Sequence, residues 1–144
     1  MTASNESIAR RWFEEVWNQR RAETVRELLT PDSYGHTHSG SLQGQEEFLK
    51  QVHTPFLESF PDLRLIIEDT VAEGDRVVVR WRVEGTHRGA GLGVEPTQRR
   101  VSFRGMTWLR FGNGKILEGI DCWNHSGLLE TLRSGQAAPS IELI

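Results

Sequence analysis

The spacing of apolar residues changes about 60 residues into the chain. Before that point Ile8, Trp12 and Val16 recur every four residues, which places them on one face of an amphipathic helix. Beyond it Val77 and Val79 alternate with more polar neighbours, which is typical of a strand with one buried face. The pattern therefore predicts a helical first half followed by a β-sheet.

The helical half divides into three predicted segments. They span residues 4–20, 22–29 and 45–60. Ser4 is a favourable N-cap for the first helix. Pro31 ends the second, and Pro55 is expected to kink or split the third, because proline cannot donate the helical hydrogen bond.

Four strands and a closing helix make up the second half. The predicted strands are residues 63–71, 76–86, 101–111 and 115–124, and the helix is residues 126–132. Turns at residues 73–75 and 112–114 and a long loop after residue 87 join the strands into a meander. In the second strand Trp81 shares a face with the valines, whereas Arg80 and Arg82 share the other.

Helices followed by an antiparallel meander predict an α+β domain with its helices on one face of the sheet. Where helices cross a strongly curved sheet they leave a cone between them, in which a small ligand fits. The 144 residues suit a single domain, 1–144. Its core is expected over about residues 8–132, with a loose tail over residues 134–144.

Composition narrows the classes of partner. There are 17 Lys and Arg against 20 Asp and Glu, a net charge of −3, so no basic excess points to nucleic acid. No secretory signal or membrane-length apolar run is visible, and the expected location is the cytoplasm without membrane association. The single cysteine, Cys122, excludes an internal disulfide and a Cys-rich zinc site. His36 and His38 lack a clear third ligand, so no metal is expected.

Several short motifs occur in a familiar order. They include Trp12-Phe13-Glu14-Glu15-Val16-Trp17-Asn18, Phe60-Pro61-Asp62-Leu63, Gly85-Thr86-His87-Arg88-Gly89 and Gly114-Lys115-Ile116-Leu117-Glu118. Together they resemble the SnoaL-like polyketide cyclases (ester cyclases) of the nuclear transport factor 2-like superfamily. The resemblance runs from about Ile8 to Leu132.

The resemblance implies a cystatin-like, cone-shaped α+β barrel in which a curved antiparallel sheet wraps around N-terminal helices, used as a dimer or tetramer. In these cyclases a pocket carboxylate serves as acid and base in an intramolecular aldol ring closure, without a metal or organic cofactor. Counted back from Gly127-Leu128-Leu129, its position here is Asn124. Many relatives also carry an aspartate where this chain has Asp121.

The two positions have opposite parity. Strand alternation places Asp121 with Trp123 on one face and Asn124 on the other, so if Asn124 faces the pocket, Asp121 faces away. Asp121 is predicted either as a general base or as the partner of an arginine on the neighbouring strand. Asn124 is predicted either to hold an oxyanion or to cap the closing helix.

Other side chains carry two interpretations each. By resemblance His36 lines the pocket, where it could act as general acid or base. His87 is either a polar group at the pocket mouth or a turn residue that binds the backbone. Trp12 and Trp81 form either the pocket wall or the core. His53 and His125 lie at helix-surface and helix-start positions and receive no role.

Three functions remain open. The preferred one is a cofactor-free cyclase, isomerase or hydratase acting on a small, largely apolar metabolite, in which His36 and Asp121 move a proton and Asn124 holds the oxyanion. The second is a binding protein without catalysis. The third is an interaction module, because Trp108 lies between arginines on the polar face of its strand and suggests a homodimer or tetramer formed through the sheet.

Overall fold

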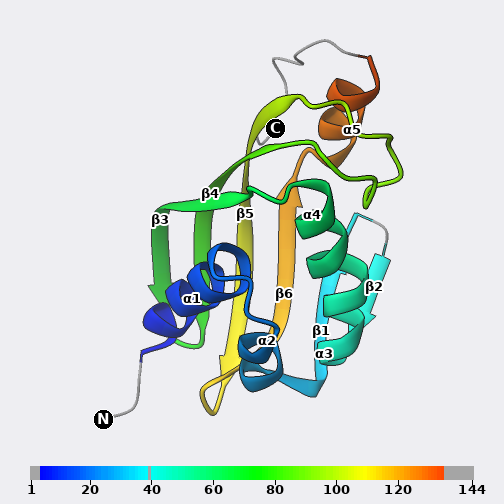
Figure 1. Cartoon of the computed structure of the whole chain (residues 1–144). Helices are drawn as coiled ribbons and strands as arrows, with labels where there is room; N and C mark the ends of the chain where they lie inside the picture. The colour runs from blue at the N-terminus through cyan, green and yellow to red at the C-terminus, as the bar shows by residue number, and fades with distance from the viewer. Residues whose placement is uncertain (1–3, 39, 135–144) are drawn as a thin grey trace.

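The computed structural model describes residues 4–38 and 40–134, and shows a curved six-stranded sheet with helices across one face (Figure 1). The strands are β1 (Leu29–Thr37), β2 (Gly40–Gln43), β3 (Arg64–Glu73), β4 (Arg76–Thr86), β5 (Arg100–Gly112) and β6 (Lys115–Trp123). The helical elements are α1 (Asn5–Phe13), η1 (Glu14–Asn18), α2 (Ala22–Leu28), α3 (Gly44–Phe48), η2 (Leu49–His53), α4 (Thr54–Ser59) and α5 (His125–Ser134). The predicted α+β class is confirmed. The expected tail after Ser134 lies outside the described residues.

The sheet has the order β2-β1-β6-β5-β4-β3 and does not close, because β2 and β3 form its two edges. All four predicted strands are present, but β1 and β2 were not foreseen. β1 pairs in parallel with β6, so the sheet is antiparallel except at this one junction. The signal was missing because Pro31 and Gly35 interrupt a segment that has no apolar alternation.

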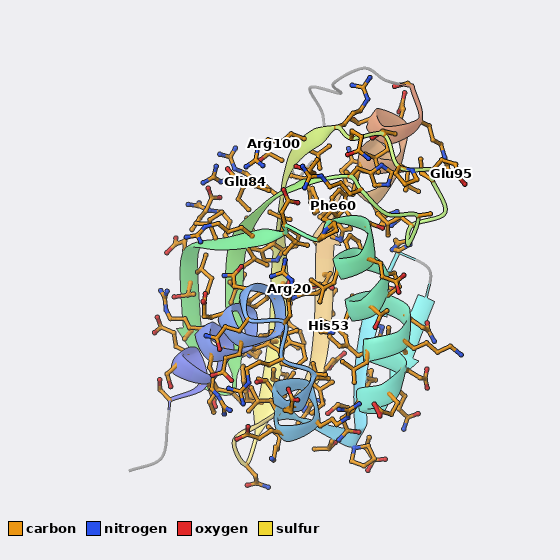
Figure 2. The ribbon with its side chains drawn as sticks, in the orientation of Figure 1. Arg20, His53, Phe60, Glu84, Glu95 and Arg100 are labelled. Carbon is orange, nitrogen blue, oxygen red and sulfur yellow. The ribbon has the colours of Figure 1, made fainter. Side chains whose placement is uncertain are left out.

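Two of the predicted helices contain a π-helical turn. The first continues from α1 into η1, and the third runs through α3, η2 and α4, with Pro55 in the first turn of α4. The two π turns are tied together by His53, which is 5 % exposed and donates from Nε2 to the Val16 carbonyl over 2.7 Å. His53 lies on the inner side of its helix (Figure 2), so its expected surface position was wrong.

The helices are also fixed to the sheet by polar side chains. Ser4 caps α1 by accepting a hydrogen bond from the Ser7 amide, as predicted. Asn18 imitates a strand partner, because its amide group donates to the Leu65 carbonyl and accepts from the Leu65 amide, at 2.9 and 2.7 Å. The helix formed by α1 and η1 is thus held against β3.

The long loop between β4 and β5 packs on α4. The amide of Arg88 donates to the Ser59 carbonyl over 2.9 Å. A Cβ atom on Gly89 would lie 1.9 Å from the Glu58 carbonyl oxygen, and one on Gly91 would lie 2.2 Å from that of Pro55. The glycines of this loop therefore allow close backbone approach to a helix. No helix within the described ranges is long and apolar enough to cross a membrane.

Candidate functional site

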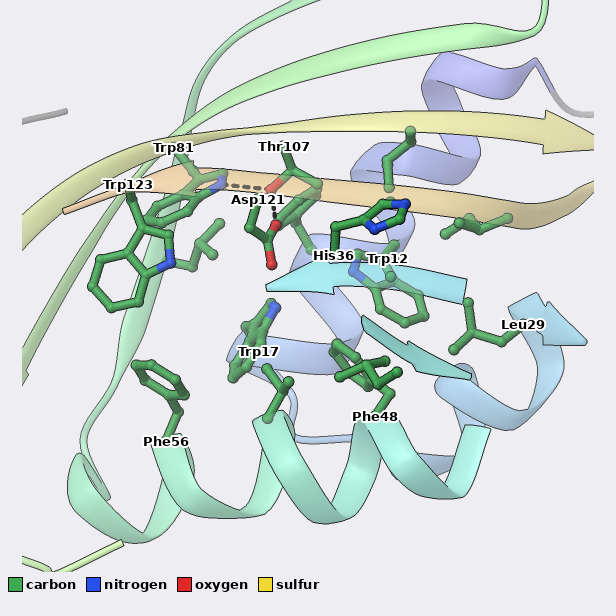
Figure 3. A pocket seen from close by; sticks show the side chains of 18 of the residues that line it. Trp12, Trp17, Leu29, His36, Phe48, Phe56, Trp81, Thr107, Asp121 and Trp123 are labelled. Carbon is green, nitrogen blue, oxygen red and sulfur yellow. Dashed lines mark hydrogen bonds between the residues drawn. The ribbon is translucent and has the colours of Figure 1, made fainter. Parts of the chain in front are cut away.

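The concave face of the sheet and the helices enclose a cavity of about 120 Å³, hereafter the main cavity. Its wall is largely apolar and aromatic, and the lining side chains converge on the cavity in Figure 3. The aromatic rings of this wall belong to Trp12, Phe13, Trp17, Phe48, Phe56, Trp81, Phe103 and Trp123. Tyr34 also borders the cavity, but its ring packs against His36 on the convex face. Such a wall favours a flat, hydrophobic ligand.

A carboxyl group enters this apolar wall from β6. Trp81 donates from Nε1 to the Thr107 hydroxyl over 2.9 Å, and Thr107 donates to Asp121 Oδ1 over 2.6 Å. Trp81 and Thr107 are both buried. The second carboxyl oxygen of Asp121 points into the cavity (Figure 3). This chain of hydrogen bonds fixes one oxygen and presents the other to a ligand.

The backbone beneath the carboxyl is shaped by a glycine. A Cβ atom on Gly105 would lie 2.5 Å from the Trp81 ring and 2.7 Å from Cβ of Trp123. Gly105 thus leaves room for two indoles, which come from the strands on either side of β5. Trp123 also stacks on Phe103, with ring centroids 4.9 Å apart. Asp121 is flanked by these rings and not by an arginine.

The electrostatic state of Asp121 follows from this setting. The side chain keeps accessible surface because it borders the cavity. Protein nevertheless surrounds the carboxyl, and burial raises its pKa above the ordinary value, while the hydrogen bond from Thr107 acts in the opposite direction. A raised pKa brings the protonated and ionised forms of the carboxyl closer to balance at neutral pH than in an ordinary aspartate, which suits a group that accepts and returns a proton.

His36 borders the main cavity, but its imidazole belongs to a polar cluster on the convex face. It pairs with Ile120 across the sheet, and Ile120 has the parity opposite to Asp121. His36 Nε2 lies 3.0 Å from Glu118 Oε2, and Arg110 lies 3.3 Å from the other oxygen of that carboxyl. Burial of Glu118 opposes ionisation, yet the hydrogen bonds from His36 and Arg110 lower its pKa. The structure does not bring His36 and Asp121 together.

Asn124 and His87 lie outside the lining of the main cavity. Asn124 Oδ1 accepts from the Gly127 amide over 2.9 Å at the start of α5, the capping geometry foreseen as its second interpretation. His87 is completely buried beneath the loop, where Nδ1 accepts from the Thr97 amide over 3.2 Å. Burial lowers the pKa of His87 and thus favours the neutral imidazole.

A family model for the SnoaL-like polyketide cyclases matches residues 7–132. The chain belongs to this family. Its similarity to solved structures covers nearly the whole chain, whereas no curated protein is significantly similar in sequence.

Three solved structures illustrate the range of the family. A protein from Jannaschia sp. CCS1, provisionally assigned as a SnoaL-like polyketide cyclase, is 26 % identical, with a TM-score of 0.82 over 96 % of this chain and 99 % of that one. AclR from Streptomyces galilaeus, provisionally assigned as a hydroxylase, is 30 % identical, with 0.78 over 90 % and 96 %. IdmH from Streptomyces antibioticus, provisionally assigned as a polyketide cyclase, is 26 % identical, with 0.77 over 91 % and 99 %.

Within this SnoaL-like fold the predicted wall residues Trp12 and Trp81 do line the main cavity. Sequence reasoning missed the role of Thr107, since a threonine on an apolar strand face carries no signal of its own. Trp123 could have been found, because its shared parity with Asp121 was visible. Among the described residues, no group of three or more His, Cys, Asp or Glu could hold a metal ion.

Proposed function

We propose that this SnoaL-like protein is a cofactor-independent cyclase in which Asp121 is the acid and base. The observation that carries the proposal is a single carboxyl of raised pKa set in an aromatic cavity, with one oxygen held by Thr107. The ligand is a flat, largely apolar metabolite that carries two carbonyl groups, since ring closure requires a carbon acid and an electrophile in one molecule.

The reaction follows from the position of the carboxyl. Asp121 removes a proton from the carbon beside one carbonyl, and the electron pair of that C–H bond moves into an enolate. The enolate carbon attacks the second carbonyl of the same molecule and forms the new C–C bond. The alkoxide that results takes the proton back from Asp121, so protons and electrons balance. The aromatic walls hold the two carbonyl carbons in proximity and reduce the entropic cost of closure.

The proposal differs from the predicted mechanism in two residues. His36 points to the convex face and Asn124 caps α5, so neither takes part in the proposed step. The alternative is a binding protein that holds the same ligand without chemistry. A carboxyl costs free energy in an apolar wall, and a binding protein would gain from its replacement by an amide.

Proton exchange on a simple ketone tests the step without knowledge of the natural substrate. In D2O we expect the protein to accelerate exchange of the methyl protons of 2-acetylnaphthalene, measured by NMR. Asp121→Asn should reduce the catalysed rate about 100-fold or more, which is typical for loss of a general base. Glu118→Gln removes a carboxyl from the opposite face of the same strand and should leave the rate unchanged. Equal rates for the wild type and Asp121→Asn would contradict the proposal.

A further inference from the structure

A second, smaller cavity adjoins the main cavity beside Asp121, hereafter the side cavity. Its volume is about 40 Å³. Five residues line both cavities: Leu42, Val52, Phe56, Asp121 and Trp123. The three that belong to the side cavity alone are polar: Thr37, His38 and Gln51. Asp121 therefore lies where an aromatic chamber meets a chamber with polar donors.

His38 is held in place by a ring from the other end of the chain. It follows β1, whereas His125 begins α5, and their rings stack with centroids 3.5 Å apart and an angle of 15° between planes. Two imidazolium rings would repel each other at this separation. Burial, together with the charges of His38 and Arg133, lowers the pKa of His125 to about 4. Burial also lowers the pKa of His38. The stacked pair is thus neutral at pH 7.

The charges around the two cavities select the kind of group that fits. Among the described residues that line either cavity, none is Lys or Arg. The only carboxyl present is Asp121, which repels an anion whenever it is ionised. Besides Asp121, the polar groups of the side cavity are the imidazole of His38, the primary amide of Gln51 and the hydroxyl of Thr37. The imidazole and the amide can each donate a hydrogen bond to a ligand, whereas the hydroxyl donates to the Gly40 carbonyl over 2.9 Å.

We propose that the side cavity is the subsite for a neutral carbonyl oxygen of the ligand, held by His38 and Gln51. This rests on the proposed function, because it places that carbonyl next to the carbon from which Asp121 takes the proton. The ring system lies in the main cavity and the carbonyl oxygen in the side cavity. A donor on that oxygen also stabilises the enolate that forms when the proton leaves. The subsite thus selects ketones, esters or amides over hydrocarbons and carboxylates.

A matched pair of probes measures how much a carbonyl oxygen of the ligand contributes to binding. 2-Acetylnaphthalene and 2-isopropenylnaphthalene differ in the exchange of a carbonyl oxygen for a CH2 group, and equilibrium dialysis gives the dissociation constant of each. We expect the wild type to bind the ketone about three- to tenfold more tightly, as one or two neutral hydrogen bonds provide. His38→Phe keeps a ring against His125 but removes the donor, and should bring the ratio close to one. Gln51→Leu should reduce the ratio in part, and Gln19→Leu, at an exposed site away from both cavities, should not.

The outcomes distinguish failure of the carbonyl subsite from failure of the proposed cyclase chemistry on which it rests. A ratio unchanged in both His38→Phe and Gln51→Leu would overturn the subsite, as would 2-naphthoate bound more tightly than the ketone. Proton exchange that is insensitive to Asp121→Asn, together with the expected ratios, would overturn the chemistry and leave the subsite standing. If neither neutral probe binds the wild type, both proposals fail.

Discussion

Thr107 accepts a hydrogen bond from Trp81 and donates one to Asp121, so it influences the acidity of that carboxyl. Burial raises the pKa of Asp121 above its ordinary value, and the Thr107 hydroxyl opposes that shift by stabilising the ionised carboxyl. Thr107→Val removes that hydrogen bond, and we expect the rising limb of the pH–rate profile for ketone exchange to move to higher pH. The rate along that limb should fall severalfold, because less of the base is ionised there. Thr107→Ser retains the hydroxyl and should keep the profile of the wild type.

A displaced profile is the informative readout, since a merely structural role for Thr107 would lower the rate equally at every pH. Trp81→Phe removes the hydrogen bond that the indole donates to the Thr107 hydroxyl, which lies one bond further from Asp121. A profile for Thr107→Val that coincides with that of the wild type would show that the hydroxyl does not tune Asp121.

His53 contributes to stability through one buried hydrogen bond. His53→Phe keeps the ring among Trp17 and Phe48 but leaves the Val16 carbonyl without its donor. A buried carbonyl that loses its partner costs about 1–3 kcal/mol. We therefore expect a decrease of that size in the free energy of unfolding, measured with urea. His53→Gln can donate from its amide and should recover part of the loss, whereas equal stability of His53→Phe and the wild type would contradict the assignment.

At the scale of elements, the loop over residues 88–99 depends on glycines where it meets α4. Gly89→Ala places a methyl group against the Glu58 carbonyl, which a helix backbone cannot move away to accommodate. Overpacking of this kind costs about 1–3 kcal/mol. We expect the loop to detach from α4 and become sensitive to limited proteolysis, while Ala90→Ser, at an exposed neighbour, stays resistant. Resistance of Gly89→Ala equal to that of the wild type would show that the contact does not hold the loop.

The elements differ in how far the sequence could predict them. The period of four around Trp12 and the period of two around Val79 were enough to locate the helices and four strands. The π turns were not visible, because one extra residue in a turn barely alters an apolar stripe. β1 was missed because a polar segment such as Tyr34-Gly35-His36 lacks the alternation of apolar residues that predicts a buried strand face. Its pairing with β6 is made by backbone hydrogen bonds, which leave no pattern in the sequence.

The sequence predicted part of the site, as it predicted part of the fold. Alternation showed that Asp121 and Trp123 share a face and that Asn124 does not, but it did not show which face is concave. That choice depends on the curvature of the whole sheet and on the helices packed against it. The assignment of His36 to the pocket came from the resemblance, and its pairing with Glu118 requires the parallel strand that was not foreseen.

At the scale of the whole molecule, the convex face of the sheet is the surface that we propose to pair with a second copy. Trp108 lies half-buried between Val78 and Ile120 on the neighbouring strands, and Tyr34 is 41 % exposed further along the same face. Aromatic residues bordered by arginines are enriched in protein interfaces. We expect a dimer or a larger assembly at micromolar concentration in sedimentation velocity.

A charge at the centre of that surface tests the interface. Trp108→Glu should shift the species to a monomer without loss of circular dichroism, because the side chain points away from the core. Gln19→Lys, at an exposed position after η1 on the helix side of the sheet, serves as control and should leave the assembly intact. A wild-type monomer under these conditions would contradict the sheet interface.

The two π turns have a consequence for how such a cavity changes in evolution. A π turn holds one residue more than the α turn it replaces, and Trp17 and Val52 both reach the main cavity from such turns. Loss of a single codon within either turn would shorten it to an α turn and leave the residues beyond it on the same faces of the helix, because the π turn already accommodates one extra residue. The cavity wall would change at one turn in one genetic step, while the remaining lining residues and the sheet that carries Asp121 kept their positions.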